Sequence, residues 1–194
     1  MIGILTFYWA DDYGALLQCY ALKTYLSEFD NISVMPYSPK NLRSRSGLLN
    51  FSKWDKMIKK IRMVGHQLRT KEFYSRLAAK LRMAYFRRRF LTADFRKLDS
   101  ARRIPTCRRG ISVYIVGSDQ VWNPEITEGL QEGYFCAFPK PKGARFIAYA
   151  ASIGSERLDV AYDAMIARYF ENFDAVSVRE GTSASYIEKV YSRK

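Results

Sequence analysis

Residues 114–124 read Tyr-Ile-Val-Gly-Ser-Asp-Gln-Val-Trp-Asn-Pro, and they are the most informative stretch of the chain. A run of β-branched and aromatic residues that begins at Ile111 stops at Gly117, and small and polar side chains follow it. In an open α/β sheet, a buried strand carries polar side chains in this way to the crevice at its carboxyl end, where ligands bind. An ordinary turn after a strand is the competing interpretation, because this pattern alone has low specificity.

Two later strands are predicted to end in similar clusters. Arg145–Ser152 stops at small residues, and Ala175–Val178 is followed directly by Arg179. Because the carboxyl ends of parallel strands meet at one edge of a sheet, we expect residues 117–119, Ser152 and Arg179 to converge there. A lone arginine after a strand is usually a surface ion pair, but an arginine beside serine and aspartate in a crevice is suited to holding a phosphate or carboxylate.

The N-terminal segment has the pattern of a βαβ unit. Ile2–Tyr8 is an apolar run suited to a central parallel strand, Ala15–Leu26 is a helix, and Ile32–Met35 is the next strand. The crossover should be right-handed. Gly14 allows a close approach of the backbone at the turn into the helix, where free amides could hold an anion. The competing interpretation is that one of the two aspartates before the helix caps it.

Helices predicted at Leu158–Phe170 and Ala184–Val190 alternate with the later strands. The sequence therefore predicts an α/β fold, in which residues 1–40 and 110–194 form a Rossmann-like parallel sheet with helices on both faces. The chain has 194 residues, of which 48% are hydrophobic, so it is long enough to bury one substantial core. Residues 41–109 would interrupt this body as a basic helical insert.

The predicted insert is strongly basic. Residues 41–110 contain 21 Lys and Arg residues against 4 Asp and Glu residues, whereas the rest of the chain contains 11 against 15. Such a segment should attract an anionic surface, whether phospholipid, nucleic acid or a phosphorylated glycan. No motif that reads RNA or DNA is visible, so nucleic acid ranks last.

Two amphipathic helices are predicted within the insert. The first has an apolar stripe within residues 51–64, and the second is surrounded by basic residues that include Arg87–Arg89. The stripe of the second consists of Phe73, Leu77, Leu81 and Tyr85. We favour packing of both stripes on the domain itself, with the cations presented to water. The alternative is a membrane-surface hairpin whose aromatic side chains enter the headgroup region, and whose salt-sensitive binding is lost when Arg87–Arg89 become Ala.

Other features favour a cytoplasmic protein, with peripheral contact at the inner face of the membrane as an option. Three widely spaced cysteines form no CxxC pair, which argues against a disulfide framework or a zinc site. The N-terminus is typical of a first strand rather than a signal peptide, and no run of 18 apolar residues is present. The single histidine, His66, is interpreted as a solvated residue, and no metal is expected.

Several motifs resemble those of the polysaccharide pyruvyl transferase family. Residues 6–22 fit the pattern Thr-Phe-x-x-Ala-Asp-x-Tyr-Gly-Ala-x-Leu-Gln-x-Tyr-Ala-Leu, and residues 116–124 fit a second and very specific one. The segments Tyr-Ala-Ala-Ser-Ile-Gly at 149–154 and Ser-Val-Arg-Glu at 177–180 follow in the right order. The resemblance covers essentially the whole chain, with the basic insert as its most variable part. Members usually carry Asn where Asp12 stands.

The resemblance implies the N-terminal half of a two-domain fold similar to the GT-B glycosyltransferases, with the active site between two Rossmann-like halves. The implied reaction moves pyruvate from phosphoenolpyruvate onto two hydroxyls of a sugar, and it makes a cyclic ketal in surface polysaccharide biosynthesis. The donor phosphoenolpyruvate is a substrate, and no further cofactor is implied. The acceptor is a saccharide that could be lipid-linked. This chemistry needs a general acid for the enol methylene and fixed cations for the phosphate and carboxylate of the donor.

The resemblance also implies roles for particular residues. Arg179 matches a motif arginine of the family and is expected to contact the anionic donor. Asp119 and Ser118 are the catalytic candidates, which would orient donor or acceptor hydroxyls, although Asp119 as a buried structural cap is the competing interpretation. The further candidates for substrate binding are Asp12, Gly14, Gly117, Gln120, Trp122, Asn123 and Ser152.

Full members of the family are considerably longer than this chain and keep further Arg and His residues in their second half. A C-terminal domain is therefore expected to be absent here, and pyruvyl transfer by this chain alone should be negligible. Phosphate release from phosphoenolpyruvate with a sugar acceptor measures this, and robust turnover would contradict it. Two alternatives stay open. One is half of a GT-B-type glycosyltransferase, which would transfer a glycosyl group without forming a ketal, and the other is a non-catalytic basic module that binds anionic membrane.

Overall fold

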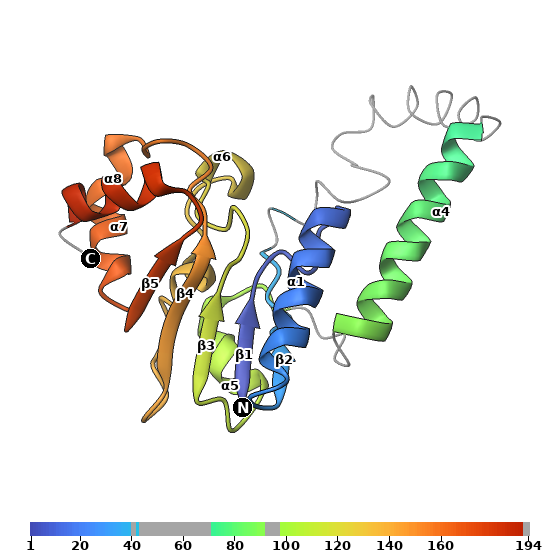
Figure 1. Ribbon diagram of the computed structural model, residues 1–194, viewed down its shortest axis with the longest axis horizontal. Coiled ribbons are helices and arrows are strands. Elements are labelled where there is room, and N and C mark those ends of the chain that lie inside the picture. Colours follow the sequence, from blue (N-terminus) through green and yellow to red (C-terminus); the bar gives the residue numbers. More distant parts are fainter. Residues whose placement is uncertain (40–41, 43–70, 92–97, 192–194) are drawn as a thin grey trace, which may run out of the picture.

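A parallel sheet of five strands forms the centre of the computed structural model, which describes residues 1–39, 42, 71–91 and 98–191 (Figure 1). The strands lie in the order β2-β1-β3-β4-β5, and every neighbouring pair is parallel. Their bounds are Ile2–Leu5 for β1, Ile32–Val34 for β2, Val113–Val116 for β3, Arg145–Ala151 for β4 and Ala175–Val178 for β5. The predicted α/β fold with a Rossmann-like parallel sheet is confirmed.

Alternate residues of the central strands pack on opposite faces of the sheet, as the period of a strand requires. Ile4 of β1 packs with Leu22 of helix α1 (Tyr13–Leu26) on one face. Leu5 and Val116 belong to the larger cluster on the other face. Because both faces of β1 and β3 are covered, these strands read as continuous apolar runs in the sequence.

The other helices surround the sheet, with α7 and α8 beside β5 and with α1 and α4 at the β2 end (Figure 1). Their bounds are α4 Lys71–Phe86, η1 Arg87–Leu91, η2 Ala101–Arg103, α5 Ile104–Cys107, α6 Pro124–Thr127, η3 Glu132–Phe135, η4 Val160–Tyr162, α7 Asp163–Phe170 and α8 Gly181–Tyr191. Of these, η1 is a π-helical turn and the other η elements are 3₁₀ turns.

Aromatic side chains pack together in the largest hydrophobic cluster of the described residues. Trp122 stacks on Phe135 at a centroid distance of 5.5 Å and meets the edge of Phe170 at 5.0 Å. Its indole N–H donates to the carbonyl oxygen of Tyr134 at 2.7 Å. Trp122 is fully buried, and a buried aromatic pair adds about 0.5–1.5 kcal/mol beyond the area it covers. The loop after β3 is therefore fastened to the core by its tryptophan.

The chain at residues 36–38 lies beside Leu98, near the sheet. Ser38 N–H donates to the carbonyl of Leu98 at 2.7 Å, and Leu98 N–H donates to the carbonyl of Pro36 at 2.7 Å. Leu98 and Ile104 pack in the same core cluster as the sheet, although they fall within the predicted insert of residues 41–109. The first predicted helix of the insert, within residues 51–64, lies outside the described residues.

Helix α4 confirms the second predicted helix of the insert, but its buried face differs from the prediction. Met83 is buried against α1, with Ala79 and Phe86 partly buried beside it. Leu81 and Tyr85, which we expected to pack, are 62% and 65% exposed. Met83 is two positions from both Leu81 and Tyr85. Because an α-helix turns by about 100° per residue, the buried row and the predicted row lie about 200° apart around the helix. The predicted packing of this stripe on the domain is thus wrong for Leu81 and Tyr85.

Element ends also differ from the prediction by a few residues. Strand β1 ends at Leu5 rather than Tyr8, since the chain turns there and Ala10 N–H donates to the carbonyl of Phe7. Helix α7 starts at Asp163 because a separate 3₁₀ turn, capped by Asp159, precedes it. These shifts leave the order and type of the elements unchanged.

Candidate functional site

The candidate site lies where the order of strands reverses. From β1 the chain first adds β2 on one side and later adds β3 on the other, so the carboxyl ends of β1 and β3 are neighbours. Gly117 N–H donates to the carbonyl of Leu5 across this pair at 3.1 Å. In doubly wound sheets, a crevice opens at such a reversal because the connections leave in opposite directions, and ligands bind there.

A chain of side-chain hydrogen bonds joins the two strand ends. Ser118 Oγ donates to Gln18 Oε1 at 2.9 Å, and Gln18 Nε2 donates to Thr6 Oγ1 at 2.9 Å. Gln18 also donates to the carbonyl of Ala15 within α1. Because the Ser118 proton is used by Gln18, its oxygen can meet a ligand only as an acceptor in this arrangement. Ser118 is therefore oriented by a residue of α1 rather than left free to rotate.

Asp12 caps α1, which confirms the capping interpretation for that residue. Its Oδ1 accepts the Ala15 N–H at 2.8 Å, and its backbone is extended as an N-cap requires. The carboxylate therefore accepts a hydrogen bond from one of the amides at the helix start that we considered as donors to an anion. A side chain at Gly14 would lie 3.1 Å from the same carboxylate oxygen. Anion binding by Gly14 stays a prediction, but it would have to share this end of α1 with Asp12.

The basic segment contacts this loop through Arg87 and Lys80. Arg87 Nη1 donates to Asp11 Oδ1 at 3.0 Å and to the carbonyl of Ala10 at 2.9 Å. Lys80 Nζ lies 3.3 Å from the other carboxylate oxygen of Asp11. Arg87 was predicted to be one of the cations available to an anionic surface, and in the structure its side chain is 19% exposed and holds the β1–α1 loop.

The tip of β3 is held against β4 by the backbone. Gly117 has φ +111°, and a Cβ built there would clash with the carbonyl oxygen of Tyr149, so only glycine suits this position. The carbonyl of Asp119 accepts the Ser152 N–H at 3.0 Å, and Trp122 N–H donates back to the Ser152 carbonyl at 3.2 Å. The loop that carries Asp119 is thus fixed in place before any ligand binds.

Only one of the two carboxylate oxygens of Asp119 has a hydrogen-bond partner among the described residues. Its Oδ1 accepts the Gln120 N–H at 2.8 Å, whereas Oδ2 is buried and has no hydrogen-bond partner in the described part of the chain. Burial raises the pKa of Asp119, while the Gln120 N–H and the positive charge of Arg179 oppose that rise and the charge of Asp12 adds to it. Asp119 therefore holds a proton more readily than an exposed aspartate. Its free oxygen can donate or accept, depending on that proton.

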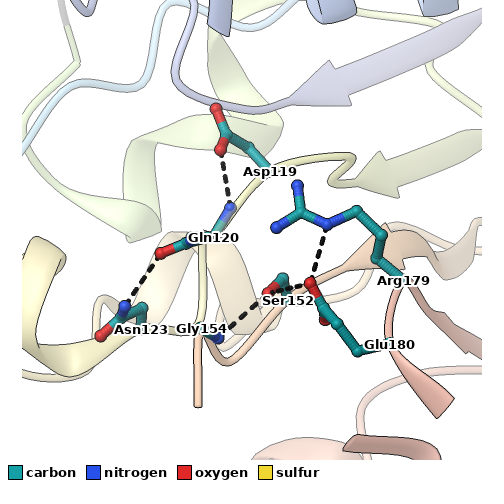
Figure 2. A network of polar contacts seen from close by, with 7 residues as sticks. All are labelled: Asp119, Gln120, Asn123, Ser152, Gly154, Arg179 and Glu180. Carbon is teal, nitrogen blue, oxygen red and sulfur yellow. Dashed lines mark hydrogen bonds and ion pairs between the residues drawn. The ribbon is translucent and has the colours of Figure 1, made fainter. Parts of the chain in front are cut away.

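Arg179 lies beside Ser152 and Glu180 at the same edge (Figure 2). Arg179 Nε donates to Glu180 Oε1 at 2.8 Å, and Ser152 Oγ donates to the same oxygen at 3.0 Å. The backbone N–H of Arg179 donates to the carbonyl of Ala151 at 3.1 Å. Figure 2 shows the guanidinium between this pair and the Asp119 segment, and its terminal nitrogens have no hydrogen-bond partner among the described residues. A paired contact of these two nitrogens with a phosphate or carboxylate stays a prediction.

The rest of the 117–124 motif builds the loop. Asn123 Oδ1 accepts the Glu125 N–H at 3.0 Å as the cap of α6, and Asn123 Nδ2 donates to Gln120 Oε1 at 3.0 Å. Gly154 has φ +72°, and a Cβ built there would clash with Asn123 Nδ2. Trp122 is fully buried in the core, so its side chain cannot touch a ligand in this structure. Asn123 is 7% exposed and acts here as a structural residue.

The expected convergence of strand ends is therefore present in the structure. It brings Ser118, Asp119, Ser152 and Arg179 to one edge, while their roles with substrate stay predictions. The sequence placed Glu180 with Arg179 in the polar cluster after the last strand but gave it no role, and it did not predict the link made by Gln18. The glutamine stands within the residue 6–22 pattern, which was the one signal for it.

In the ranges that the structure describes, no three His, Cys, Asp or Glu side chains gather as a metal site would require. Among the helices of these ranges, none combines the length and apolar character needed to span a bilayer.

The model of one protein family, described as polysaccharide pyruvyl transferase, matches residues 12–193. This match includes Asp12, Gln18, Ser118, Asp119, Ser152, Arg179 and Glu180, whereas Leu5, Thr6, Ala10 and Asp11 precede it. No curated protein and no solved structure matches the chain.

Proposed function

This chain belongs to the polysaccharide pyruvyl transferase family, and we propose that it serves the transfer of pyruvate from phosphoenolpyruvate to a saccharide in surface polysaccharide biosynthesis. In this reaction the methylene carbon of the donor takes a proton and becomes a methyl group. One sugar hydroxyl then adds to the neighbouring carbon. A second hydroxyl displaces the phosphate and closes a ketal ring. One hydroxyl proton balances the new methyl group and the other leaves with phosphate.

The observation that carries this proposal is that the terminal nitrogens of Arg179 have no hydrogen-bond partner among the described residues. Glu180 holds its Nε, so the guanidinium is oriented without occupying its terminal nitrogens. Phosphoenolpyruvate carries a carboxylate and a phosphate, and both match the paired donors of an arginine. The side chain of Arg179 is 45% exposed, so an anion can reach it from solvent.

Asp119 and Ser118 would act on the hydroxyls of the reaction. Ser118 can accept from a hydroxyl because its own proton is bound by Gln18. Asp119 lies at the end of β3 with one buried oxygen that has no hydrogen-bond partner among the described residues, and burial raises its pKa. A carboxyl of this kind is suited to orienting a hydroxyl and to exchanging a proton with it. Catalysis through Asp119 and Ser118 is part of the proposal, and donor binding by Arg179 can be tested separately.

Binding of phosphoenolpyruvate by isothermal titration calorimetry tests the proposal. Replacing Arg179 with Ala should weaken binding by about tenfold or more, because a charge-assisted hydrogen bond contributes about 1.5–3 kcal/mol. Arg179→Lys should recover only part of the loss, since lysine lacks the paired geometry. Arg145→Ala is the matched control, because Arg145 is exposed at the amino end of β4, at the opposite edge of the sheet. Equal affinity of the Arg179→Ala variant would contradict the proposal, and tight binding of a nucleotide sugar instead of phosphoenolpyruvate would favour a glycosyltransferase.

We further propose that the surface formed by α1 and α4 contacts anionic membrane, where a lipid-linked acceptor would be found. An apolar groove between these helices is lined by Tyr13, Leu16, Leu17, Arg82, Met83 and Phe86. Tyr13 and Leu17 are 53% and 56% exposed at its rim, and Arg82 supplies a cation beside them. Apolar side chains next to cations are the composition that binds the interface of an anionic bilayer.

Co-sedimentation with phosphatidylglycerol vesicles tests this contact. Leu17→Glu should abolish it, and Arg82→Glu should weaken it most at low salt, where charge contributes most. Phe29→Glu is the matched control, because Phe29 is equally apolar and 67% exposed but lies after the other end of α1. Binding to neutral phosphatidylcholine vesicles as strong as to phosphatidylglycerol would contradict the electrostatic part of the proposal.

A further inference from the structure

A cleft of about 510 Å³ opens beside the β1–α1 loop and α6. Its lining comprises Trp9, Ala10, Asp11, Asp12, Leu42, Glu125 and Ile126. Its volume falls in the range of small-molecule sites, which run from about 300 to 1,000 Å³. Every described residue of this lining is apolar or acidic, which sets the cleft apart from the arginine at the end of β5.

The acidic groups of the cleft differ in how far they are already used. Arg87 and Lys80 hold Asp11. Asp12 commits Oδ1 to the start of α1, while its second oxygen has no hydrogen-bond partner among the described residues. The Glu125 side chain is exposed and likewise has no hydrogen-bond partner in the described ranges. Because Arg87 and Lys80 offset the charge of Asp11, the cleft offers the carboxylates of Asp12 and Glu125 as acceptors to a ligand rich in hydroxyl donors, and these two charges disfavour an anion beside them.

Trp9 provides an aromatic wall with a fixed position. Its indole N–H donates to the Tyr134 hydroxyl at 3.1 Å, and its ring meets the Phe7 ring at a centroid distance of 5.7 Å and an angle of 60°. A pyranose ring has an apolar face of C–H bonds and a rim of hydroxyls. An aromatic wall beside carboxylates matches both parts, as in ligand sites where apolar walls surround a few polar groups.

We propose that this cleft binds a neutral saccharide, with Trp9 against the sugar face and with Asp12 and Glu125 accepting hydroxyl hydrogen bonds. That this saccharide is the acceptor of pyruvyl transfer rests on the proposed function. The cleft adjoins the strand tips through Asp12, whose charge acts on Asp119. The division of labour follows from charge: the anionic donor binds at Arg179, and the neutral acceptor binds at the acidic cleft.

Saturation-transfer difference NMR with the methyl pyranosides of glucose, galactose and mannose tests the cleft. We expect at least one of them to bind, and we expect methyl glucuronide to bind more weakly because of its carboxylate. Glu125→Gln should lower the affinity for the sugar by about tenfold or more, since the charged acceptor of a hydrogen bond is lost. Asp12→Asn should weaken it as well, while the asparagine still caps α1. Glu171→Gln is the control, because Glu171 follows α7 and does not line the cleft.

The inference is overturned if none of the three neutral sugars binds, if the glucuronide binds as tightly as they do, or if both variants bind like the wild type. Far-ultraviolet circular dichroism of Glu125→Gln and Asp12→Asn shows that each remains folded. Titration of phosphoenolpyruvate separates this result from the proposed function. A chain that binds phosphoenolpyruvate through Arg179 but no sugar refutes the cleft alone. A chain that binds sugar in the cleft but no phosphoenolpyruvate refutes the proposed reaction and leaves a saccharide-binding site.

Discussion

Replacing Asp119 with Asn should stabilise the folded protein at neutral pH, although Asp119 lies at the centre of the candidate site. Its Oδ2 is buried without a hydrogen-bond partner among the described residues, and burial raises the pKa of the group. An unpaired buried polar atom costs about 1–3 kcal/mol, and a charged one costs more. Arg179 and the Gln120 N–H recover part of this cost. Asparagine keeps the shape and an acceptor for Gln120, but it removes the charge.

We expect a gain of about 1 kcal/mol, because the amide of asparagine is itself left with an unpaired group. For a chain of this length, that gain raises the midpoint of thermal unfolding by about 2–4 °C. The sign of the pH dependence is fixed by linkage. A carboxyl with a raised pKa binds more protons in the folded state, so the wild type loses stability as pH rises from the ordinary aspartate pKa to the raised one. The advantage of Asp119→Asn should therefore be largest at pH 7 and should shrink toward pH 4.

Thermal unfolding followed by circular dichroism between pH 4 and 8 measures this effect. Asp174→Asn is the control of opposite sign, because the Lys140 side chain, followed by the Phe146 N–H, lowers the pKa of Asp174. The stability that the ionised Asp174 contributes is present above the ordinary aspartate pKa and is lost in acid. Asp174→Asn should therefore be less stable than the wild type at pH 7. The reasoning is refuted if Asp119→Asn melts below the wild type at pH 7, or if the difference between them does not change with pH.

Three further substitutions test the architecture of the site. Gly117→Ala should destabilise the fold by about 3 kcal/mol in urea unfolding, because φ is +111° and the new Cβ meets the Tyr149 carbonyl; a loss below about 1 kcal/mol would contradict that geometry. Trp122→Phe should cost about 2–3 kcal/mol through the lost indole hydrogen bond and the cavity, yet leave the affinity for phosphoenolpyruvate unchanged by calorimetry; weaker binding at unchanged stability would place this residue at the ligand after all. Gln18→Leu should cost about 1–2 kcal/mol in urea unfolding, because Ser118 and Thr6 both lose their hydrogen-bond partner; a loss below about 0.5 kcal/mol would show that this link between the strand ends is unimportant.

The sheet and its polar edge were predictable because the relevant signals are local. Apolar runs such as Ile111–Val116 identify buried strands, and the residue types just after them identify the edge at which they end. Parallel strands must place those ends together, whatever the order of the strands. The convergence of Asp119 and Arg179 followed from this rule alone. The strand order itself depends on contacts between distant segments and was not predicted.

The sequence did not show which residues of the 117–124 motif belong to the candidate site and which ones pack in the core. Trp122 and Asp119 stand three positions apart in one motif, yet the first is fully buried in the core and the second is only partly buried at the end of β3. Only the packing of η3 and α7 against the loop separates them. The clamp of Arg87 on Asp11 is likewise non-local, since it joins residues 76 positions apart.

The face of α4 shows a second limit of sequence reasoning. The helical period was correctly identified, but the helix has two apolar rows, and the sequence does not say which one a neighbour covers. Contact with α1 selects Met83 and leaves Leu81 exposed.

The most direct test of the central claim is a difference electron-density map from crystals of the protein soaked with phosphoenolpyruvate. Density for the donor should appear at the carboxyl edge of the sheet, with a phosphate or carboxylate oxygen within hydrogen-bonding distance of the terminal nitrogens of Arg179. Donor density elsewhere on the protein, with the guanidinium of Arg179 left without a contact, would contradict the account.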